Sequence, residues 1–298
     1  MKTTRKQLDR AGLLKLASGA SVLTAGILIV AKLVAWSVTG SVSLLASLVD
    51  SVMDSIASLI NLFAIRYSLQ PADEQHRFGH GKAEPLAGLA QAAFIAGSAF
   101  FLVFHAIDRL RFARQLEQVG VGVGVMVLAI ALTLVLLIIQ RYVIRKTDST
   151  AIRADSLHYL TDLLTNMSVL LALYLSTLGW VWADPVFAIA VAVYIFYSAF
   201  QIGREAFQQL MDRELPDEIL QQIQATAMSH AEVIGTHDMR TRQAGHTRFV
   251  QLHLELDENL PLKRAHAIAD EVEAEILAYL PGAEVIIHQD PEVDTRGS

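Results

Sequence analysis

Two pairs of side chains that can ligate a metal lie inside apolar stretches of the chain. Asp50 and Asp54 are four residues apart in a run rich in Leu, Val, Ile, Ala and Ser, and His158 and Asp162 repeat that spacing in a later run. On a helix, residues four apart lie on one face about one turn from each other. Two carboxylates at this spacing repel each other, and burying each in an apolar medium costs several kcal/mol. A bound cation would offset that cost.

Facing each other, the two pairs predict one metal site. Asp50, Asp54, His158 and Asp162 would supply one nitrogen and three oxygen donors. Such a set suits a divalent transition metal, Zn²⁺ above all, because Zn²⁺ favours tetrahedral coordination, whereas Mg²⁺ and Ca²⁺ prefer six or more oxygens. The chain has no cysteine, so thiolate ligands and disulfides are excluded. The alternative role for an intramembrane Asp is a hydrogen bond between helices. Two matched pairs favour the metal.

Two further groups of residues offer ligands with weaker signals. A polar loop carries one carboxylate and two imidazoles within eight residues, namely Asp73, His76 and His80. Loops of this composition are common, so the pattern alone is weak evidence. Towards the C-terminus, the ligand types are scattered over separate predicted elements, at His237, His253, His266, His288 and Asp290. On the pattern alone, these histidines are interpreted as surface and strand residues.

Other polar residues of the apolar runs have structural explanations. Asp155 is expected at the membrane interface near the start of its helix, where a negative charge suits the helix dipole. Lys15 and Lys32 lie near the ends of the first run, where a long side chain can reach the interface. Asn61 and Asn166 are interpreted as hydrogen-bonding groups between helices.

Composition divides the chain into two parts. Of its 298 residues, 53% are hydrophobic and 18% charged, against about 25% charged in soluble domains. Residues 1–212 hold 17 Lys+Arg against 14 Asp+Glu, whereas residues 213–298 hold 7 against 16, together with six of the ten His. The sequence therefore predicts a transmembrane domain over 1–212 and an acidic, His-rich cytoplasmic domain over 213–298.

Six apolar runs predict an all-α domain of six spans. Each run is close to or longer than the ~20 residues that a spanning helix requires; they are 13–36, 41–66, 85–107, 118–140, 150–178 and 185–210. An even number of spans puts both termini on one side. That side carries 13 Lys and Arg, against three on the other, Arg109, Arg111 and Arg114. The positive-inside rule therefore predicts cytoplasmic termini. No cleavable signal peptide is evident.

The remaining residues predict a small α+β domain. Residues 217–229 and 261–279 have helical amphipathicity, 233–242 and 247–256 alternate like strands around a turn at 243–246, and 284–288 read as a last strand. The order α-β-β-α-β suits a sheet with both helices on one face.

Five motifs of the sequence resemble those of a known protein family. They are GSVSLLASLVDSVMD at 40–54, RFGHGKAE at 77–84, His158-x₃-Asp162, LMDR at 210–213 and VIIHQDP at 285–291. Together they resemble the cation diffusion facilitator family, in particular its bacterial zinc and ferrous-iron efflux transporters. The resemblance implies a homodimeric inner-membrane antiporter with a metallochaperone-like cytoplasmic domain. Such transporters export Zn²⁺, and related ions such as Fe²⁺ and Cd²⁺, in exchange for protons.

The resemblance also assigns the residues. It implies a transport site at Asp50, Asp54, His158 and Asp162 and a loop site at Asp73, His76 and His80. It implies a binuclear cytoplasmic site at His237, His253, His266, His288 and Asp290, whose metals bridge the dimer. Lys82 and Asp212 match a pair that ties the membrane helices to the cytoplasmic domain. Zn²⁺ would be both cargo and structural ion. No organic cofactor and no nucleic-acid partner are expected.

Exchange of metal for protons is expected because both bind the same ligand atoms. Metal binding needs ionised carboxylates and a neutral imidazole, so protons and Zn²⁺ compete for one site. His158 is the natural titrating group, since an unperturbed imidazole titrates near pH ~6.5. Two rival hypotheses are a membrane-embedded metallohydrolase, disfavoured because no HExxH-like motif is present, and a membrane-anchored metal sensor, which would not need carboxylates within two helices.

Overall fold

A computed structural model describes residues 2–40, 42–111, 120–178, 180 and 183–292. The chain separates into two compact units: Leu8–Phe207, and Gln208–Ser298 together with Met1–Gln7. Each unit is described by itself.

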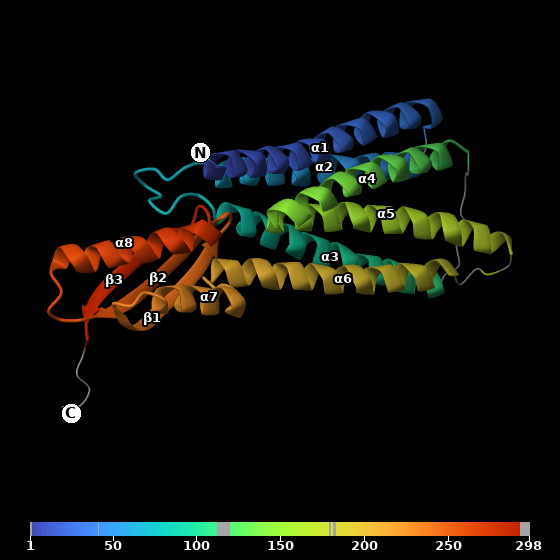
Figure 1. The fold of residues 1–298 in the computed structure, drawn as a ribbon. Helices are drawn as coiled ribbons and strands as arrows, with labels where there is room; N and C mark the ends of the chain where they lie inside the picture. The colour runs from blue at the N-terminus through green and yellow to red at the C-terminus, as the bar shows by residue number, and fades with distance from the viewer. Residues whose placement is uncertain (1, 41, 112–119, 179, 181–182, 293–298) are drawn as a thin grey trace. The chain divides into compact units, whose positions relative to one another are not determined.

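In the described residues, six long helices lie wholly or mostly in the first unit (Figure 1): α1 Lys2–Thr39, α2 Val42–Ser68, α3 Ala83–Arg111, α4 Gly120–Thr147, α5 Thr150–Thr177 and α6 Ala183–Leu210. Five of them contain a stretch long and apolar enough to cross a membrane. Among the described residues, no such stretch is found in α5, which has 28 residues like α4 and α6. The all-α class is confirmed. Arg114 and the first residues of the run 118–140 lie outside the described part of the chain.

Small side chains bring the membrane helices close together. Ala92 and Ala99 of α3 pack with Ala154 of α5 and Ala199 of α6 in one buried cluster. A Cβ on Gly88 would lie 3.1 Å from Thr150 Cγ2, so a larger residue there would need Thr150 to shift by a few tenths of an ångström. Large apolar side chains point outward instead, as at Phe101 (68% exposed) and Ile138 (69%). This inverted pattern fits a surface solvated by lipid.

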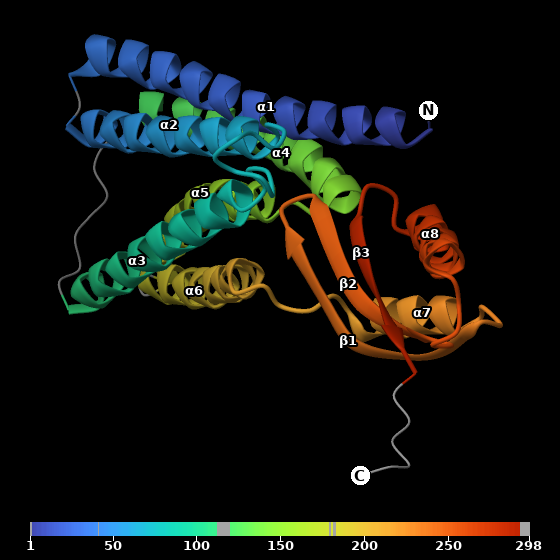
Figure 2. The same ribbon diagram turned by 90° about the vertical axis from the view of Figure 1, so that its left-hand side faces the viewer.

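The second unit has the predicted order of elements: α7 Asp217–Met228, β1 Val233–Ala244, β2 Thr247–Leu256, α8 Leu262–Tyr279 and β3 Glu284–Pro291. The sheet order is β1-β2-β3, with β2 antiparallel to β1 and parallel to β3 (Figure 2). Val250, Leu252 and Leu254 of β2 form one buried core with Ile223 of α7 and Ile268 of α8. Both helices therefore share a core with the sheet.

The hairpin is tighter than the sequence predicts. We expected β1 to end at residue 242, with a four-residue turn. The strand continues to Ala244, which pairs with Thr247, so the loop is only Gly245-His246. Gly245 has a φ of +58°, as the first position of a two-residue hairpin turn requires.

Candidate metal-binding sites

Three of the four predicted transport-site residues converge between α2 and α5. Asp54 of α2 and His158 and Asp162 of α5 each offer a ligand atom, and these atoms lie within 4.8 Å of one another. A hydrogen bond of 2.9 Å between Ser58 of α2 and Tyr159 of α5 holds the two helices together nearby. The i, i+4 spacing therefore does place His158 and Asp162 on one face, towards α2.

His158 has an unusual environment for a buried imidazole. The residue is only 7% exposed, and its Nε2 lies 3.0 Å from Oδ1 of Asp54. Within the part of the chain that the structure describes, this carboxylate is the partner of Nε2, as an ion-pair contact and not as a hydrogen bond. Buried polar atoms are normally satisfied. A buried imidazole nitrogen grouped with two carboxylates fits a cation held by all three residues.

Asp50, the fourth predicted ligand, stands apart from the other three. It lies one turn before Asp54 on α2 and is exposed, and it does not belong to the group within 4.8 Å. Its participation would require a rotamer change or a small rotation of α2.

Asp155 lies near the start of α5, as expected, but it is buried between helices, which the sequence analysis did not predict. It is fully buried, and its carboxylate accepts hydrogen bonds from Ser21 of α1 (2.6 Å), Gln91 of α3 (3.2 Å) and Gln140 of α4 (2.8 Å). Asp155 therefore joins α5 to three other helices, one turn from His158. Among the described residues, this junction is the main polar feature that sequence reasoning missed.

The loop residues Asp73, His76 and His80 form a second cluster, again with ligand atoms within 4.8 Å. Asp73 Oδ1 is 3.3 Å from His76 Nδ1, and Oδ2 is 3.3 Å from His80 Nε2. The Nδ1 of His80 contacts the carbonyl of Pro71 at 3.2 Å; donation of its proton there leaves Nε2 as the ligand nitrogen. The backbone N–H of His76 donates to Asp73 and lowers the pKa of that carboxyl group.

Strand register builds the third cluster. His237 of β1 is paired with His253 of β2, which is paired with His288 of β3, so the three imidazoles form one row across the sheet. Asp290 is central to this row: Oδ2 lies 2.7 Å from His253 Nδ1 and 3.2 Å from His237 Nε2, and Oδ1 lies 3.1 Å from His288 Nε2. The hydrogen bond from His253, and then the charges of the three imidazoles, lower the pKa of Asp290.

One residue of this third cluster was missed, and two predicted members are outside the group of ligand atoms within 4.8 Å of one another. His288 is one of them, although it contacts Asp290. Glu255 Oε1 is 2.8 Å from His237 Nδ1 and could orient that ring; its spacing of two from His253 on β2 was an available signal. His266 lies on α8, exposed, with Nε2 3.7 Å from Asp270. It is not in the group formed by His237, His253 and Asp290.

The predicted pair Lys82 and Asp212 stays a prediction, because the two residues belong to different units. Within its own unit, Asp212 accepts a long hydrogen bond of 3.4 Å from Arg242.

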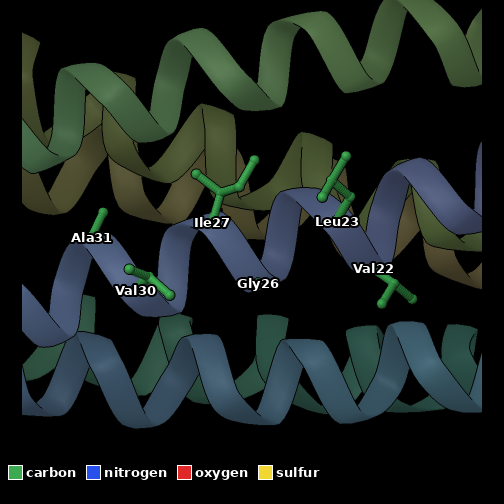
Figure 3. A pocket seen from close by; sticks show the side chains of 6 residues that line it. All are labelled: Val22, Leu23, Gly26, Ile27, Val30 and Ala31. Atoms are coloured by element: carbon green, nitrogen blue, oxygen red, sulfur yellow. The ribbon is translucent and has the colours of Figure 1, made fainter.

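A groove on α1 has the opposite character to the three clusters. Figure 3 shows that its lining is apolar throughout, formed by Val22, Leu23, Gly26, Ile27, Val30 and Ala31. Leu23 and Val30 are more than half exposed. This surface offers no metal ligand and suits contact with lipid.

Comparison with known proteins decides the family. Residues 19–211 match the description "Cation efflux transmembrane domain" and residues 215–292 match "Cation efflux protein, cytoplasmic domain". The chain belongs to the cation efflux, or cation diffusion facilitator, family. Similar proteins include the "Cation-efflux pump FieF" of Klebsiella pneumoniae, 53% identical over 272 residues and 91% of each chain. That of Serratia proteamaculans is 54% identical over 281 residues and 94% of each chain.

Family membership makes this chain a multi-pass inner-membrane transporter rather than an enzyme. Similar solved chains include two that each cover about a quarter of this chain. A CzrB chain described as a "Zn form" is 32% identical and covers 27% of this chain and 93% of its own, with a TM-score of 0.26. A MamM C-terminal domain in a "Nickel form" is 16% identical and covers 26% and 100%, with a TM-score of 0.25.

Proposed function

We propose that this transporter exports divalent metal cations, Zn²⁺ in the first place, in exchange for protons. The observation that carries the proposal is the convergence of Asp54, His158 and Asp162, with the buried Nε2 of His158 3.0 Å from Asp54. The efflux pumps that the chain resembles over nine-tenths of its length support the direction of transport. One nitrogen and several oxygen ligands favour Zn²⁺, and the stability order of divalent ions ranks Zn²⁺ above Fe²⁺ and Mn²⁺.

Competition for the same atoms would couple the two fluxes. Metal needs the carboxylates ionised and the His158 ring neutral, while protons occupy these same positions when the metal leaves. The helices that carry the ligands would open alternately to the two sides of the membrane. We further propose that the protein works as a homodimer with both termini in the cytoplasm. The loop cluster and the row of histidines on the sheet would bind additional metal ions.

Flux through reconstituted vesicles tests the proposal. Vesicles with an acidic interior and an enclosed Zn²⁺ dye should take up Zn²⁺ as protons leave, and collapse of the pH gradient should stop the uptake. Asp54→Ala should abolish flux, whereas an apolar surface variant such as Leu23→Ala should retain it. Normal transport by Asp54→Ala would refute the site.

Selectivity tests the role of the imidazole. His158→Asp replaces the only nitrogen ligand by oxygen, so Cd²⁺ and Mn²⁺ flux should rise relative to Zn²⁺. An unchanged order of preference would show that His158 does not select the ion.

A further inference from the structure

Lys32 is a cation of the membrane unit that the proposed mechanism does not use. We expected its side chain to reach for the membrane interface. Instead its ammonium donates to Ser51 Oγ at 2.6 Å and to the carbonyl oxygen of Ser47 at 3.1 Å, both on α2. Ser51 directly follows Asp50 and precedes Asp54 by three residues. The charge of α1 therefore lies on the stretch of α2 that carries two of the proposed ligands.

The surroundings of this ammonium are strongly acidic. Asp50 directly precedes Ser51, Asp54 lies on the next turn of α2, and Asp162 of α5 is grouped with Asp54. The two hydrogen-bond acceptors, however, are neutral oxygens. The two hydrogen bonds to α2 therefore hold the Lys32 ammonium near the carboxylates. Because both acceptors are uncharged, they do not neutralise the positive charge of Lys32.

The net charge of the proposed transport site indicates a role for Lys32. Three ionised carboxylates and a neutral imidazole carry a charge of minus three, and a divalent ion reduces it to minus one. Net charge in the apolar interior of a membrane is costly. Counting only the four proposed ligands and the ion, one fixed positive charge beside them would bring the total to zero. Asp155 is a further buried carboxylate, but it already has three hydrogen-bond donors of its own.

We propose, resting on the proposed transport site, that Lys32 is the fixed counter-charge of that site and sets its affinity for divalent cations. Its ammonium repels the metal enough to keep binding reversible and balances the residual charge of the loaded site. Without Lys32, the more negative site would hold a divalent ion more tightly.

Three substitutions separate the charge of Lys32 from its hydrogen bonds. Lys32→Arg keeps the charge and the donors, Lys32→Gln keeps donors but loses the charge, and Lys32→Met loses both. The probe is Zn²⁺, titrated calorimetrically at about pH 8 into the full-length protein. His80→Ala and His253→Ala are added to every protein, so that heat reports the α2–α5 site.

Loss of the charge should tighten Zn²⁺ binding in both neutral variants. For a separation on the order of 8 Å between the ammonium and the ion, Coulomb's law at effective dielectric constants between roughly 80 and 20 gives a decrease in Kd of about five-fold to a thousand-fold. Lys32→Arg should stay within about two-fold of the unsubstituted residue. Wild-type affinity in Lys32→Gln, whether or not Lys32→Met changes, would overturn the proposal.

A parallel titration of Asp54→Ala distinguishes this inference from the function on which it rests. If Asp54→Ala still binds Zn²⁺ normally, the proposed transport site itself is wrong. If Asp54→Ala loses binding while Lys32→Gln binds as the wild type does, the site stands and only the role of Lys32 is refuted.

Discussion

Replacing Asp155 by alanine should destabilise the membrane unit by about 2–4 kcal/mol, as an orphaned donor and lost interhelical hydrogen bonds together predict. The carboxylate receives one hydrogen bond from each of α1, α3 and α4. Hydrogen bonds between membrane helices contribute on average about 0.6 kcal/mol and at most about 1.7 kcal/mol. Relief of the buried charge offsets part of the loss of three such bonds.

The substitution Asp155→Ala affects the three hydrogen-bond donors unequally. The Ser21 hydroxyl can still donate to the carbonyl of Ala17 at 3.1 Å, and Gln140 Nε2 can still donate to Ser21 Oγ at 3.0 Å. Gln91 loses the acceptor with which it is paired at 3.2 Å. An unsatisfied buried donor costs about 1–3 kcal/mol, so Gln91 accounts for a large share of the predicted effect.

A double-mutant cycle measures that share. Asp155→Ala, Gln91→Ala and the double variant are unfolded reversibly in detergent by SDS, with circular dichroism as the signal. The double variant should be at least about 1 kcal/mol more stable than the sum of the single effects predicts, because removing Gln91 removes the orphaned donor. Asp155→Asn should lie between wild type and alanine, since one amide oxygen still accepts but its NH₂ faces donors. Additive effects in the cycle, or a fully stable Asp155→Ala, would refute the hydrogen-bonded junction.

Two further predictions concern the cytoplasmic unit. Its three imidazoles hold the pKa of Asp290 below the usual value, so the stability that Asp290 contributes is present above the unfolded pKa of about 3.9 and is lost as pH falls through the lower folded pKa. Asp290→Asn should remove this part of the acid transition in metal-free protein, followed by circular dichroism of β-structure; an unaltered acid titration would contradict the assignment. Gly235→Ala would place a Cβ 2.4 Å from Glu255 Oε2, so Glu255 must turn away from His237. Zn²⁺ affinity at this cluster should fall about ten-fold or more, the usual effect of losing an orienting partner, with little change in thermal stability, and titration calorimetry against Glu255→Ala should give the same loss.

Local periodicity correctly predicted the features that depend on a single helix or strand. Spacing of four placed His158 and Asp162 on the same face of α5, and strand alternation gave the order and nearly the bounds of the cytoplasmic elements. Pairing between elements could not be predicted in the same way. The row of His237, His253 and His288 depends on strand order and register, which the hydrophobic alternation of single strands does not specify. Resemblance to a family, rather than the pattern itself, brought these histidines together.

Asp155 shows where the reasoning from helix spacing was incomplete. Residues 155, 158 and 162 follow one another at intervals of three and four, so the same periodicity that paired His158 with Asp162 also puts Asp155 on their face. Its position near the helix start favoured an interface and the dipole, but the face on which a charge lies decides its surroundings. That face is buried in the bundle, where a carboxylate requires donors from other helices. Because Ser21, Gln91 and Gln140 come from three separate helices, only the packed structure could identify them.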